Sequence, residues 1–440
     1  MKTVRGVLVV SGALAAGAVC ADITTYRDWR LVQEEVVDTN ANDNVRLHFD
    51  MTKPLHGPWL LNPSATSMSV NWITREKCAA GIEWREKGAA DWSRRWGVLY
   101  GKLDYSKDTH TFHLDGLKPA TEYEYRFLST VDQYNCAYVQ TCIGRETYSF
   151  RTLDPAKERY TCFFTADVHG SLRLGGDEMF GRTGAKDADL YFFLGDNVND
   201  NMNEPRYYVT TGFLDDVVRL WGRSKPTVFV RGNHDCWGRH ATEGWAEYYA
   251  RPDGRGYFTV AQGPALFVVF DMAEEYRMRS AAGREAQAAD RAEQLAWFRA
   301  LKASAQWRTA TFRIAMCHYG TRTGAGNFKE TRAWLRDELV GANGVHLFLC
   351  GHEHFYARSL PHDKEVFHNA RYDRPKAKPH KFPLCDGTDD YTEICGNSRE
   401  ALMLEVAPDR LVVRSCDFVH PEAGDLDRVE ILPDRTARAL

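Results

Sequence analysis

The sequence predicts an all-β domain followed by a larger α/β domain. At 440 residues the chain exceeds the usual size of one compact domain, so two domains are expected. Between about residues 57 and 152, short segments of alternating polar and apolar residues are separated by turn residues, which is typical of a β-sandwich. After Pro155, near-continuous apolar runs alternate with helical stretches. That pattern indicates an α/β fold whose sheets are covered on both faces.

The α/β domain is predicted from six apolar runs and one clear helix. Residues 288–303 show helical spacing, with Leu295, Phe298 and Leu301 on one side. The remaining signal comes from runs that are too short and too apolar for exposed helices and are therefore interpreted as buried strands. These runs cover residues 160–166, 190–194, 227–230, 266–270, 311–317 and 345–350.

The composition is that of an ordinary globular protein. Hydrophobic residues make up 44% of the chain and charged residues 26%, so a large core can be buried. The formal net charge of -4 is spread over charges of both signs. Without a basic tract, nucleic acid is not indicated as a partner. No segment has the roughly 18 consecutive apolar residues of a transmembrane helix, so no membrane span is predicted.

The N-terminal segment has the features of a secretory signal peptide. Lys2 and Arg5 precede an apolar run over residues 7–19, and small residues end at Ala21. This order predicts cleavage after Ala21 and a secreted or periplasmic protein. The alternative is a lipoprotein signal with the lipid on Cys20, which the large residue before it fits poorly. The expected parts of the chain are a signal peptide (1–21), an N-terminal extension (22–56), the all-β domain (57–153) and the α/β domain (154–440).

The 11 cysteines suggest disulfides in two places. Cys136 and Cys142 flank one short loop, and Cys385 and Cys395 flank another, so each pair is a candidate for a local disulfide in an exported protein. Cysteines inside apolar runs are instead expected to be buried thiols. They are Cys162, Cys317 and Cys350. No pair has the CxxC spacing of a zinc or redox site.

Polar side chains follow the apolar runs at the point where each strand is expected to end. In open α/β sheets the loops after the strands converge on one crevice, where ligands bind. Gathering carboxylates and imidazoles there is costly unless cations neutralise them. Oxygen and nitrogen ligands without thiolates favour Zn, Mn, Fe or Mg. In chain order the motifs are Asp167-Val168-His169, Gly195-Asp196-Asn197, Gly232-Asn233-His234-Asp235, His318 and Gly351-His352-Glu353-His354.

The order of these motifs resembles the calcineurin-like metallophosphoesterase superfamily. It reads D-x-H, G-D, G-N-H-D, a single H and G-H-x-H across about residues 162–356. The resemblance implies a catalytic domain built as a β-sandwich flanked by helices. The preceding domain resembles the fibronectin type III-like N-terminal domain of purple acid phosphatases, and residues 117–126 resemble its F strand. In that comparison Tyr123 takes the place of the corner tyrosine.

The resemblance also implies a pair of metal ions and two catalytic residues. The ions are divalent or trivalent, with Fe, Zn or Mn favoured, and they share a hydroxide that attacks the phosphate ester. His234 hydrogen-bonds the phosphate or protonates the leaving oxygen. Asp235 orients His234, with Asn199 or Asp200 as the alternative partner. Asp167, His169 and His354 would hold one ion, Asn233, His318 and His352 the other, and Asp196 would bridge both.

The sequence departs from purple acid phosphatases at two positions. Those enzymes carry a metal-binding tyrosine three residues after the bridging aspartate, where this chain has Asn199. They also have no histidine in the first motif, where this chain has His169. A coloured tyrosinate–ferric centre is therefore not expected.

The expected function is acid-phosphatase-like hydrolysis of small phosphate monoesters outside the cytoplasm. The alternatives are a phosphodiesterase of the same superfamily and a non-catalytic binding protein with a degenerate phosphoesterase fold. Glu353 lies between two ligands and is expected to point away from the metals. The nearby arginines are expected to be structural residues, not phosphate ligands. They are Arg231, Arg239 and Arg322.

Overall fold

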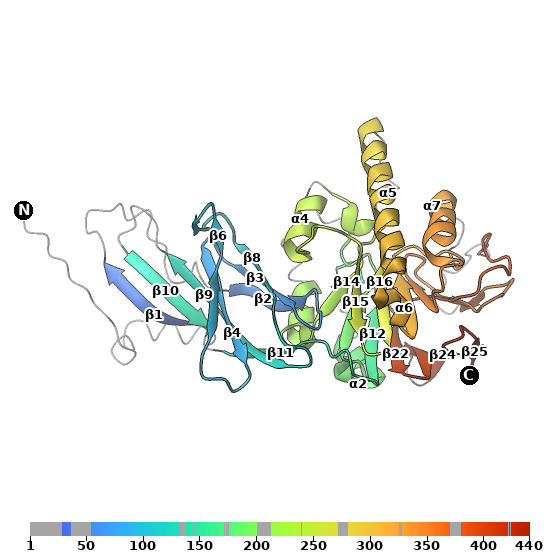
Figure 1. The fold of residues 1–440 in the computed structure, drawn as a ribbon, viewed down its shortest axis with the longest axis horizontal. Helices are drawn as coiled ribbons and strands as arrows, with labels where there is room; N and C mark the ends of the chain where they lie inside the picture. The colour runs from blue at the N-terminus through green and yellow to red at the C-terminus, as the bar shows by residue number, and fades with distance from the viewer. Residues whose placement is uncertain are drawn as a thin grey trace, which may run out of the picture.

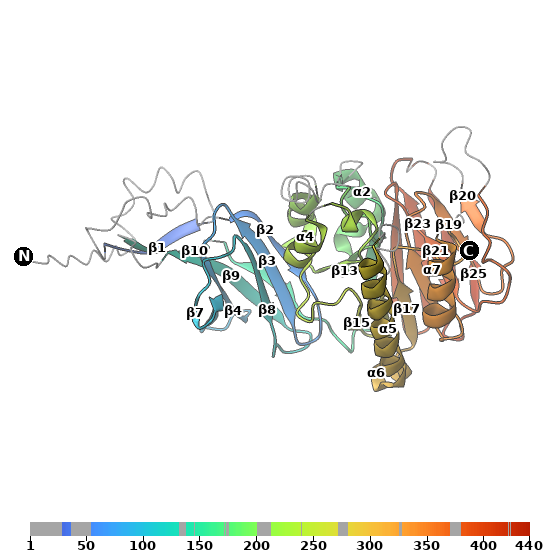
Figure 2. The ribbon, with the colours of Figure 1, turned by 90° about the horizontal axis from the view of Figure 1, so that it is seen from above.

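The computed structural model has a smaller β-domain at one end and a larger domain with helices at the other (Figure 1; Figure 2). It describes residues 29–36, 54–131, 138–144, 146–170, 172, 176–199, 213–238, 240–271, 280–324, 328–369, 380–420, 422 and 424–440. Outside these residues lie the predicted signal peptide, Asp200, Arg239 and Cys136. The proposed disulfide between Cys136 and Cys142 therefore also lies outside them. Among the helices described, none is long and apolar enough to cross a membrane.

The β-domain is a sandwich with an aromatic core. Trp72 stacks on Phe112 and Phe127, with ring centroids 5.3 and 5.1 Å away. The hydroxyl of Tyr123 accepts a 2.9 Å hydrogen bond from the backbone N–H of Lys118, so the predicted corner tyrosine is confirmed. One sheet contains β1 (Trp29–Val36), β10 (Tyr138–Gly144), β9 (Glu122–Val131), β4 (Ala79–Glu86), β5 (Ser93–Trp96) and β11 (Tyr148–Arg151). Facing it are β2 (Pro54–Leu61), β3 (Met68–Thr74) and β8 (Thr109–Leu114), and a short hairpin joins β6 (Val98–Leu99) to β7 (Lys102–Leu103).

Two features of the β-domain go beyond the sequence pattern. The strand β1 lies in the segment expected as an N-terminal extension, and it pairs with β10 of the sandwich. The strand β2 also pairs in parallel with a strand of the second domain, where Leu61 lies opposite Thr227. The two domains are therefore joined through one continuous sheet.

This continuous sheet forms the first layer of the second domain. Its central strands β12, β13 and β14 are parallel, as expected for strands joined by crossover connections. In spatial order the strands of the described chain are β25 (Ala437–Ala439), β24 (Asp425–Ile431), β23 (Arg410–Asp417), β22 (Glu400–Ala407), β12 (Tyr160–Thr165), β13 (Leu190–Phe193), β14 (Thr227–Phe229), β2, β3 and β8.

A second sheet packs on the first through a shared apolar core. Phe164 and Phe192 of the first sheet stack with centroids 4.5 Å apart, and Phe192 meets Phe267 of the second at 5.0 Å. The central strands of the second sheet are also parallel. Its order among the described residues is β15 (Phe258–Gln262), β16 (Ala265–Val269), β17 (Phe312–Met316), β18 (Leu347–Cys350), β21 (Thr392–Cys395), β19 (Tyr356–Ser359) and β20 (Phe367–Asn369).

Helices cover the outer face of each sheet, so the predicted β-sandwich flanked by helices is confirmed. Trp221 stacks on Tyr191 of the first sheet at 4.6 Å, and Phe298 meets Phe270 beside the second sheet at 5.1 Å. The first face carries α2 (Gly176–Thr183), η3 (Ala185–Asp187), α3 (Asp215–Val217), η6 (Val218–Gly222) and α4 (Ala241–Tyr248). The second carries α5 (Ala281–Ala303), α6 (Ala305–Thr309), α7 (Lys329–Trp334) and η9 (Leu335–Val340).

The helix α5 begins earlier than its apolar pattern predicts and projects from the domain (Figure 1). Its C-terminal half buries Phe298 and Leu301, as expected. Its N-terminal half is largely exposed and rich in alanine, so it shows no apolar periodicity although alanine has the highest helix propensity. The side chain of Ser280 caps this end by accepting a 2.9 Å hydrogen bond from the N–H of Gly283.

The six predicted strands are confirmed, whereas one predicted disulfide is wrong. Cys385 and Cys395 are both free thiols. Cys395 lies on β21 opposite Cys350 of β18, and its thiol donates to the carbonyl of Gly351 at 3.3 Å. Its neighbours are therefore set by the sheet and not by the short loop in sequence. The thiols of Cys162, Cys317 and Cys350 are buried and free, as predicted.

Candidate metal centre

The motif residues meet where the parallel strands of both sheets end. Three of these strands belong to the first sheet and two to the second, so the site lies at the common edge of the sandwich. Asp167 and His169 follow β12, Asp196 follows β13, Asn233 follows β14, His318 follows β17, and His352 and His354 follow β18. The structure brings all seven together in two groups.

The outer group consists of Asp167, His169, Asp196 and His354, whose candidate ligand atoms lie within 4.8 Å of one another. The Nε2 atoms of His169 and His354 are 3.2 Å apart. The Nε2 of His354 is 3.7 Å from Oδ1 of Asp167, and the Nε2 of His169 is 4.0 Å from Oδ2 of Asp196. The side chain of His354 is 56% exposed and that of His169 is 22% exposed. This group therefore opens to solvent.

The inner group consists of Asp196, His318 and His352, again with candidate atoms within 4.8 Å, and the side chain of Asn233. The Nε2 of His318 lies 3.3 Å from Oδ1 of Asp196 and 3.1 Å from Oδ1 of Asn233. The opposite ring nitrogen of His318 donates to the carbonyl of Leu194 at 2.8 Å. This bond orients the ring so that Nε2 faces the group, as in metal-binding histidines.

Unpaired buried atoms around Asp196 fit a positively charged ligand. Among the residues described, Oδ2 of Asp196 and Nδ1 of His352 are buried without a hydrogen-bond partner. Leaving such an atom unpaired costs about 1–3 kcal/mol. A cation would supply the missing partners, and the mixed oxygen and nitrogen donors suit Zn, Mn or Fe. The residues of each group therefore fit a metal ion.

Several ligand residues adopt the left-handed backbone conformation. Positive φ is uncommon outside glycine, costs free energy, and clusters at functional sites. The backbone is held in part by the carboxylates themselves, since the N–H of His352 donates to Asp167 at 3.0 Å and that of His234 donates to Asp196 at 2.8 Å. The φ values are +55° for Asp167, +48° for His169, +52° for Asp196, +76° for His352 and +58° for His354.

The glycines of the motifs are required by close packing. A Cβ on Gly232 would lie 2.1 Å from the backbone nitrogen of Asp196. A Cβ on Gly351 would lie 2.6 Å from Cβ of Ala166 and 2.9 Å from Oδ2 of Asp167. Each glycine therefore lets the following loop approach a carboxylate of the site, which gives the G-N and G-H spacing a physical reason.

The two carboxylates of the site are perturbed in opposite directions. Burial raises the pKa of Asp167 well above its usual value, and the charge of Asp196 adds to this shift. Burial also acts to raise the pKa of Asp196, but the His318 imidazole and the N–H of His234 outweigh it, and the net shift is downward. Burial lowers the pKa of His169 to about 4 and that of His352 to about 2. These two imidazoles are therefore neutral, the form that binds metals.

Comparisons with known proteins identify the domain that carries this geometry. Residues 161–356 match the family of calcineurin-like phosphoesterases, and residues 58–152 match the purple acid phosphatase N-terminal domain. The chain carries a calcineurin-like phosphoesterase domain. Together with the ligand groups, this match makes the protein a metal-dependent hydrolase of phosphoric esters.

Two solved structures share the fold over most of the chain. The purple acid phosphatase PPD1 from yellow lupin (Lupinus luteus) seeds is 15% identical, with a TM-score of 0.56 over 83% of this chain and 72% of its own. PhoD is 13% identical, with a TM-score of 0.57 over 90% of this chain and 93% of its own. No curated protein matches the chain. The classification of the first domain as fibronectin type III stays a prediction.

His234 of the phosphoesterase domain lies beside the outer group. Its Nε2 is 3.8 Å from Oδ2 of Asp196, and its ring centroid is 4.7 Å from that of His169. The ring of Trp237 packs on His234, with centroids 3.8 Å apart. Asn199, one candidate partner of His234, is exposed. The imidazole therefore lies at the border of the ligand groups.

Asp235 does not take the predicted place beside the imidazole of His234. It is wholly buried, and its carboxylate accepts hydrogen bonds from the side chain of Asn197 and the backbone N–H groups of Val198 and Gly232, at 2.9, 3.1 and 2.7 Å. The two residues begin the turn η7 (His234–Cys236), and the hydrogen bonds of Asp235 go to Asn197, Val198 and Gly232, not to the imidazole of His234. The structure therefore corrects the prediction, because Asp235 anchors the loop after Asp196 and does not orient His234.

Arg231, Arg322 and Glu353 have the structural contacts that were expected of them, whereas Arg239 lies outside the described residues. Arg322 is buried and donates to three backbone carbonyls, and Arg231 pairs with Asp271. Glu353 pairs with Arg332 and points away from the ligands, as predicted. These side chains are bound to protein partners, so phosphate binding is not assigned to them.

Three residues that contact the phosphoesterase site were not identified from the sequence. Trp237 carries the only available signal, its position three residues after His234 in the G-N-H-D motif. Arg332 and Glu393 lie far from every motif in sequence. The carboxylate of Glu393 accepts hydrogen bonds from the N–H groups of Arg322 at 3.0 Å and Thr323 at 2.8 Å, and so holds the loop that follows His318.

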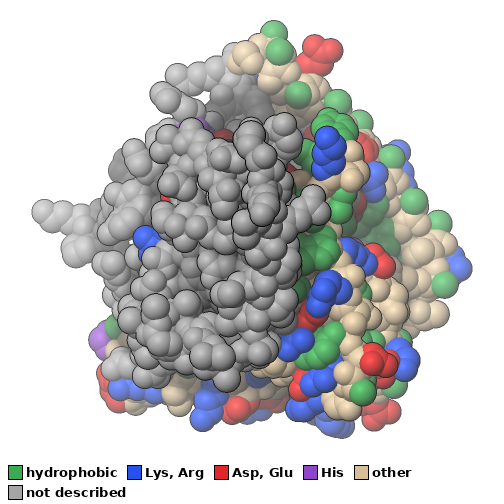
Figure 3. All heavy atoms as spheres, turned by 90° about the vertical axis from the view of Figure 1, so that its left-hand side faces the viewer, with side chains coloured by type: hydrophobic (Ala, Val, Ile, Leu, Met, Phe, Trp, Pro, Cys, Tyr) green, Lys and Arg blue, Asp and Glu red, His purple; other side chains and the backbone are tan. Residues whose placement is uncertain are grey.

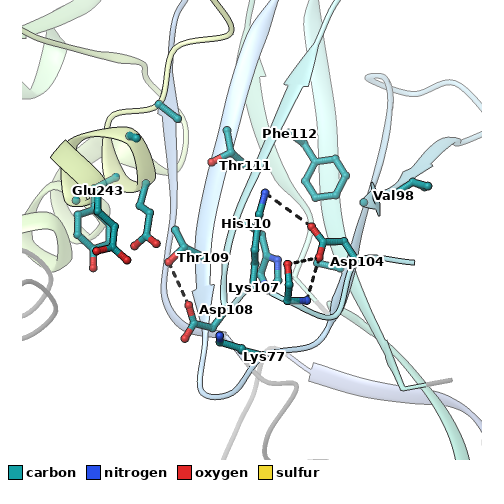
Figure 4. A pocket seen from close by; sticks show the side chains of 18 of the residues that line it. Lys77, Val98, Asp104, Lys107, Asp108, Thr109, His110, Thr111, Phe112 and Glu243 are labelled. Atoms are coloured by element: carbon teal, nitrogen blue, oxygen red, sulfur yellow. Dashed lines mark hydrogen bonds and ion pairs between the residues drawn. The ribbon is translucent and has the colours of Figure 1, made fainter. Parts of the chain in front are cut away.

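A separate hollow of about 970 Å³ lies between β8 and α4 (Figure 4). Its lining mixes acidic and basic side chains that partly pair with one another. Asp104 lies 3.7 Å from Lys107, and Glu243 lies 2.9 Å from His240. None of its lining residues belongs to either ligand group, so the hollow is distinct from the metal centre.

Proposed function

We propose that this chain is an exported phosphatase that hydrolyses small phosphate monoesters with two metal ions. The observation that carries the proposal is the position of Asp196. Its Oδ2 lies 4.0 Å from His169 in the outer group, and its Oδ1 lies 3.3 Å from His318 in the inner group. A shared carboxylate supports a bridged pair of ions about 3.5–4 Å apart, as in two-metal hydrolases. The purple acid phosphatase N-terminal domain supports the choice of a monoester substrate.

The side chains around the proposed ions have two tasks, holding ligands and moving a proton. When bound, a pair of cations supplies Lewis-acid activation of water and of the phosphoryl oxygens. The His234 side chain is 20% exposed at the border of the outer group, so its imidazole is placed to donate a proton to the leaving alcohol oxygen. The packed ring of Trp237 limits the positions that this imidazole can take.

The proposed partner is a small phosphorylated molecule and not a nucleic acid. The formal net charge is -4. On the end face shown in Figure 3, basic and acidic side chains are interspersed among the atoms that are coloured by type. Affinity for a nucleic-acid backbone depends on a patch or stripe of positive charge. The charge distribution therefore supports a substrate recognised at the metal centre.

A phosphodiesterase is the second candidate. It is favoured by the 56% exposure of the His354 side chain, which leaves space beside the outer group for a second ester substituent. A phosphate monoester has no second ester substituent to fill that space. The two candidates share the same ligands and differ in the group that the site admits.

Paired substrates separate the candidates. The protein is purified without chelator, its metal content is measured by elemental analysis, and kcat/KM is compared for p-nitrophenyl phosphate and bis(p-nitrophenyl) phosphate. We expect close to two metals per chain and the larger kcat/KM for the monoester. A larger value for the diester would establish the second candidate. Fewer than about one tightly bound metal per chain, with no hydrolysis after Mn or Zn is added, would favour a non-catalytic binding protein.

Export is proposed from the N-terminal sequence. The support is the basic start, the apolar run and the small residues before Asp22. The test is N-terminal sequencing of the mature protein from the producing cells, with Asp22 expected as the first residue. A lipid on Cys20 would indicate the lipoprotein alternative, and an intact Met1 in the cytoplasmic fraction would contradict export.

A further inference from the structure

We propose that Arg332 is a positioning residue of the metal centre, whose guanidinium holds together the loops that carry His318, His352 and His354. The inference rests on the two-metal site proposed above. Arg332 lies on α7 and is only 1% exposed. A charged side chain is rarely buried to this extent unless it is paired. Its partners therefore indicate what the buried charge does.

The guanidinium contacts both ligand loops at once. Its Nη1 donates a 2.5 Å hydrogen bond to the backbone carbonyl of Gly320, two residues after His318. Its Nη2 donates to the carboxylate of Glu353, which lies between the ligands His352 and His354. The loops follow different strands, β17 and β18. One planar group thus ties the backbone of the first loop to a side chain of the second.

The first loop is closely packed around this group. A Cβ on Gly324 would lie 1.8 Å from Nη1 of Arg332, so a side chain there would displace the guanidinium. The ring of Tyr319 lies 5.6 Å from the guanidinium carbon. The same ring meets His352 edge-on, with centroids 4.7 Å apart. Arg332 therefore supports His352 through two routes, the Glu353 carboxylate and the Tyr319 ring.

The contacts also explain the carboxylate between two ligands. The sequence predicts that Glu353, between the ligands His352 and His354, points away from the metals. Its side chain is only 7% exposed and forms an ion pair with Arg332. Its negative charge is therefore directed away from the ions and serves to orient the loop. A lysine at position 332 would keep the positive charge, but its single ammonium does not reproduce the planar fork that reaches both acceptors.

The expected benefit for the ions is a preformed site. His352 and His354 have left-handed backbones, a conformation that persists only where the surroundings hold it. Without the brace, the bound ion itself would have to order the loop, and its affinity would fall. Partners that orient metal ligands from behind typically contribute about 10- to 100-fold in metal affinity. That is the size of effect to look for.

Arg336 offers a matched control. It follows Arg332 by four residues, its side chain is 12% exposed, and it is also ion-paired. Its described contacts go to Asp386, Thr388 and Asp389, away from the ligand loops. Replacing either arginine removes one positive charge from neighbouring turns, together with one ion pair of Arg332 or two ion pairs of Arg336. Only the replacement of Arg332 removes a contact to the ligand loops.

The test measures metal affinity separately from stability. In the full chain and its Arg332→Lys, Arg332→Met and Arg336→Met variants, the Kd for Zn or Mn is measured by competition with a chelating dye. The melting temperature of the metal-free proteins is measured in parallel. We expect Arg332→Lys to weaken metal binding about 10- to 100-fold while the metal-free protein still folds. Arg336→Met should leave the Kd unchanged even where its melting temperature falls.

A double variant separates positioning from a purely structural role. In Arg332→Met with Glu353→Met, an apolar pair replaces the buried ion pair, an exchange that is often neutral or stabilising. Relative to Arg332→Met, we expect the double variant to regain the melting temperature of the metal-free protein but not the affinity for metal. The inference would be overturned if the double variant recovered both the melting temperature and the metal affinity. It would also be overturned if Arg332→Lys bound metal as tightly as the parent. If the methionine variants fail to fold, the metal affinity of Arg332→Lys alone is the test. A parent that binds no metal would overturn this inference and the proposed function together, whereas a parent that binds two metals without hydrolysing esters would overturn the function alone.

Discussion

The inner and outer ligand groups share Asp196 but differ in their surroundings. In the inner group, the side chain of His318 is fully buried and its second ring nitrogen is bound to a backbone carbonyl. In the outer group, His354 is more than half exposed and His169 is partly exposed. Arg332 contacts the loop after His318 of the inner group and Glu353, which lies between a ligand of each group. One group is built into the junction of the two sheets, and the other faces solvent.

This difference suggests a division of work between the groups. Preorganised ligands lose little freedom when an ion binds, so we expect the inner group to hold its ion more tightly. The outer group lies next to His234, where a substrate arriving from solvent would meet both a metal ligand and the proposed proton donor. We therefore expect it to exchange its ion more readily and to contact the phosphate first.

The largest effect on metal binding and activity is expected from replacing Asp196, the residue common to both groups. Asp196→Asn removes a charge that faces two sets of ligands, so both ions should bind weakly. We expect kcat/KM to fall by more than the roughly 100-fold that loss of a supporting partner costs, with metal content falling toward zero. Elemental analysis and kinetics check this, and circular dichroism verifies the fold. Retention of two tightly bound metals would show that Asp196 does not bridge them.

A pair of histidine variants tests the comparison itself. His354→Ala should leave about one tightly bound metal per chain, because water can replace an exposed ligand and the inner group is intact. His318→Ala should cost the tighter ion, since it opens a buried site beside Asn233 and Asp196. Titration of each variant with Mn, followed by activity, measures both. Equal metal content and equal Kd in the two variants would break the distinction between inner and outer groups.

Removing the proton donor should slow turnover without removing metal. His234→Ala is expected to keep both ions and to lower kcat by about 10²-fold or more. The loss should be smaller for p-nitrophenyl phosphate than for an alkyl phosphate, because p-nitrophenolate leaves without full protonation. Elemental analysis of the variant is the control. If the variant instead lost its ions, His234 would be a ligand and not a proton donor.

Acid stability is the effect farthest from the metal centre, and it must be known before metal loss at low pH can be interpreted. Burial lowers the pKa of His110 and of His346 to about 4, below the unfolded value of about 6.5. The free energy of unfolding is therefore highest above pH 6.5, where both histidines are neutral. It falls by about 3 kcal/mol for each histidine as the pH falls toward 4. Urea unfolding of the metal-free protein at pH 7 and 4.5 measures this.

A non-titrating variant provides the control for that titration. The ring of His346 accepts from the N–H of Arg313 at 3.2 Å and contacts the carbonyl of Pro433 at 3.0 Å, so protonation breaks the first bond. His346→Gln should lower stability at pH 7 and reduce the slope with pH. Equal unfolding free energies at both pH values in the parent would contradict the assignment.

The sequence predicts the strands and the ligand set because both depend on local pattern. Strands buried on both faces read as apolar runs, and each ligand motif follows such a run directly, as Gly351-His352 follows β18. Arg332 and Glu393 escape notice because they reach the site through tertiary packing alone. Their neighbours in sequence look like an ordinary helix and an ordinary strand.

The sequence does not predict the direction of the Asp235 side chain or the pairing of strands from different domains. Asp235 follows His234, yet the turn after Asn233 buries its carboxylate against Asn197, and adjacency in sequence does not reveal such a change of direction. The pairing of β14 with β2 joins segments from different domains. Neither segment carries a pattern that specifies the other, so the continuous sheet emerges only in three dimensions.

The most direct test of the account is a crystal structure of the full chain grown with Mn or Zn and measured for anomalous scattering. We expect two anomalous peaks about 3.5–4 Å apart, one on each side of the Asp196 carboxylate. One peak should lie within reach of His169 and His354, and the other within reach of His318 and His352. A single peak away from Asp196, or no peak between these side chains, would contradict this expectation.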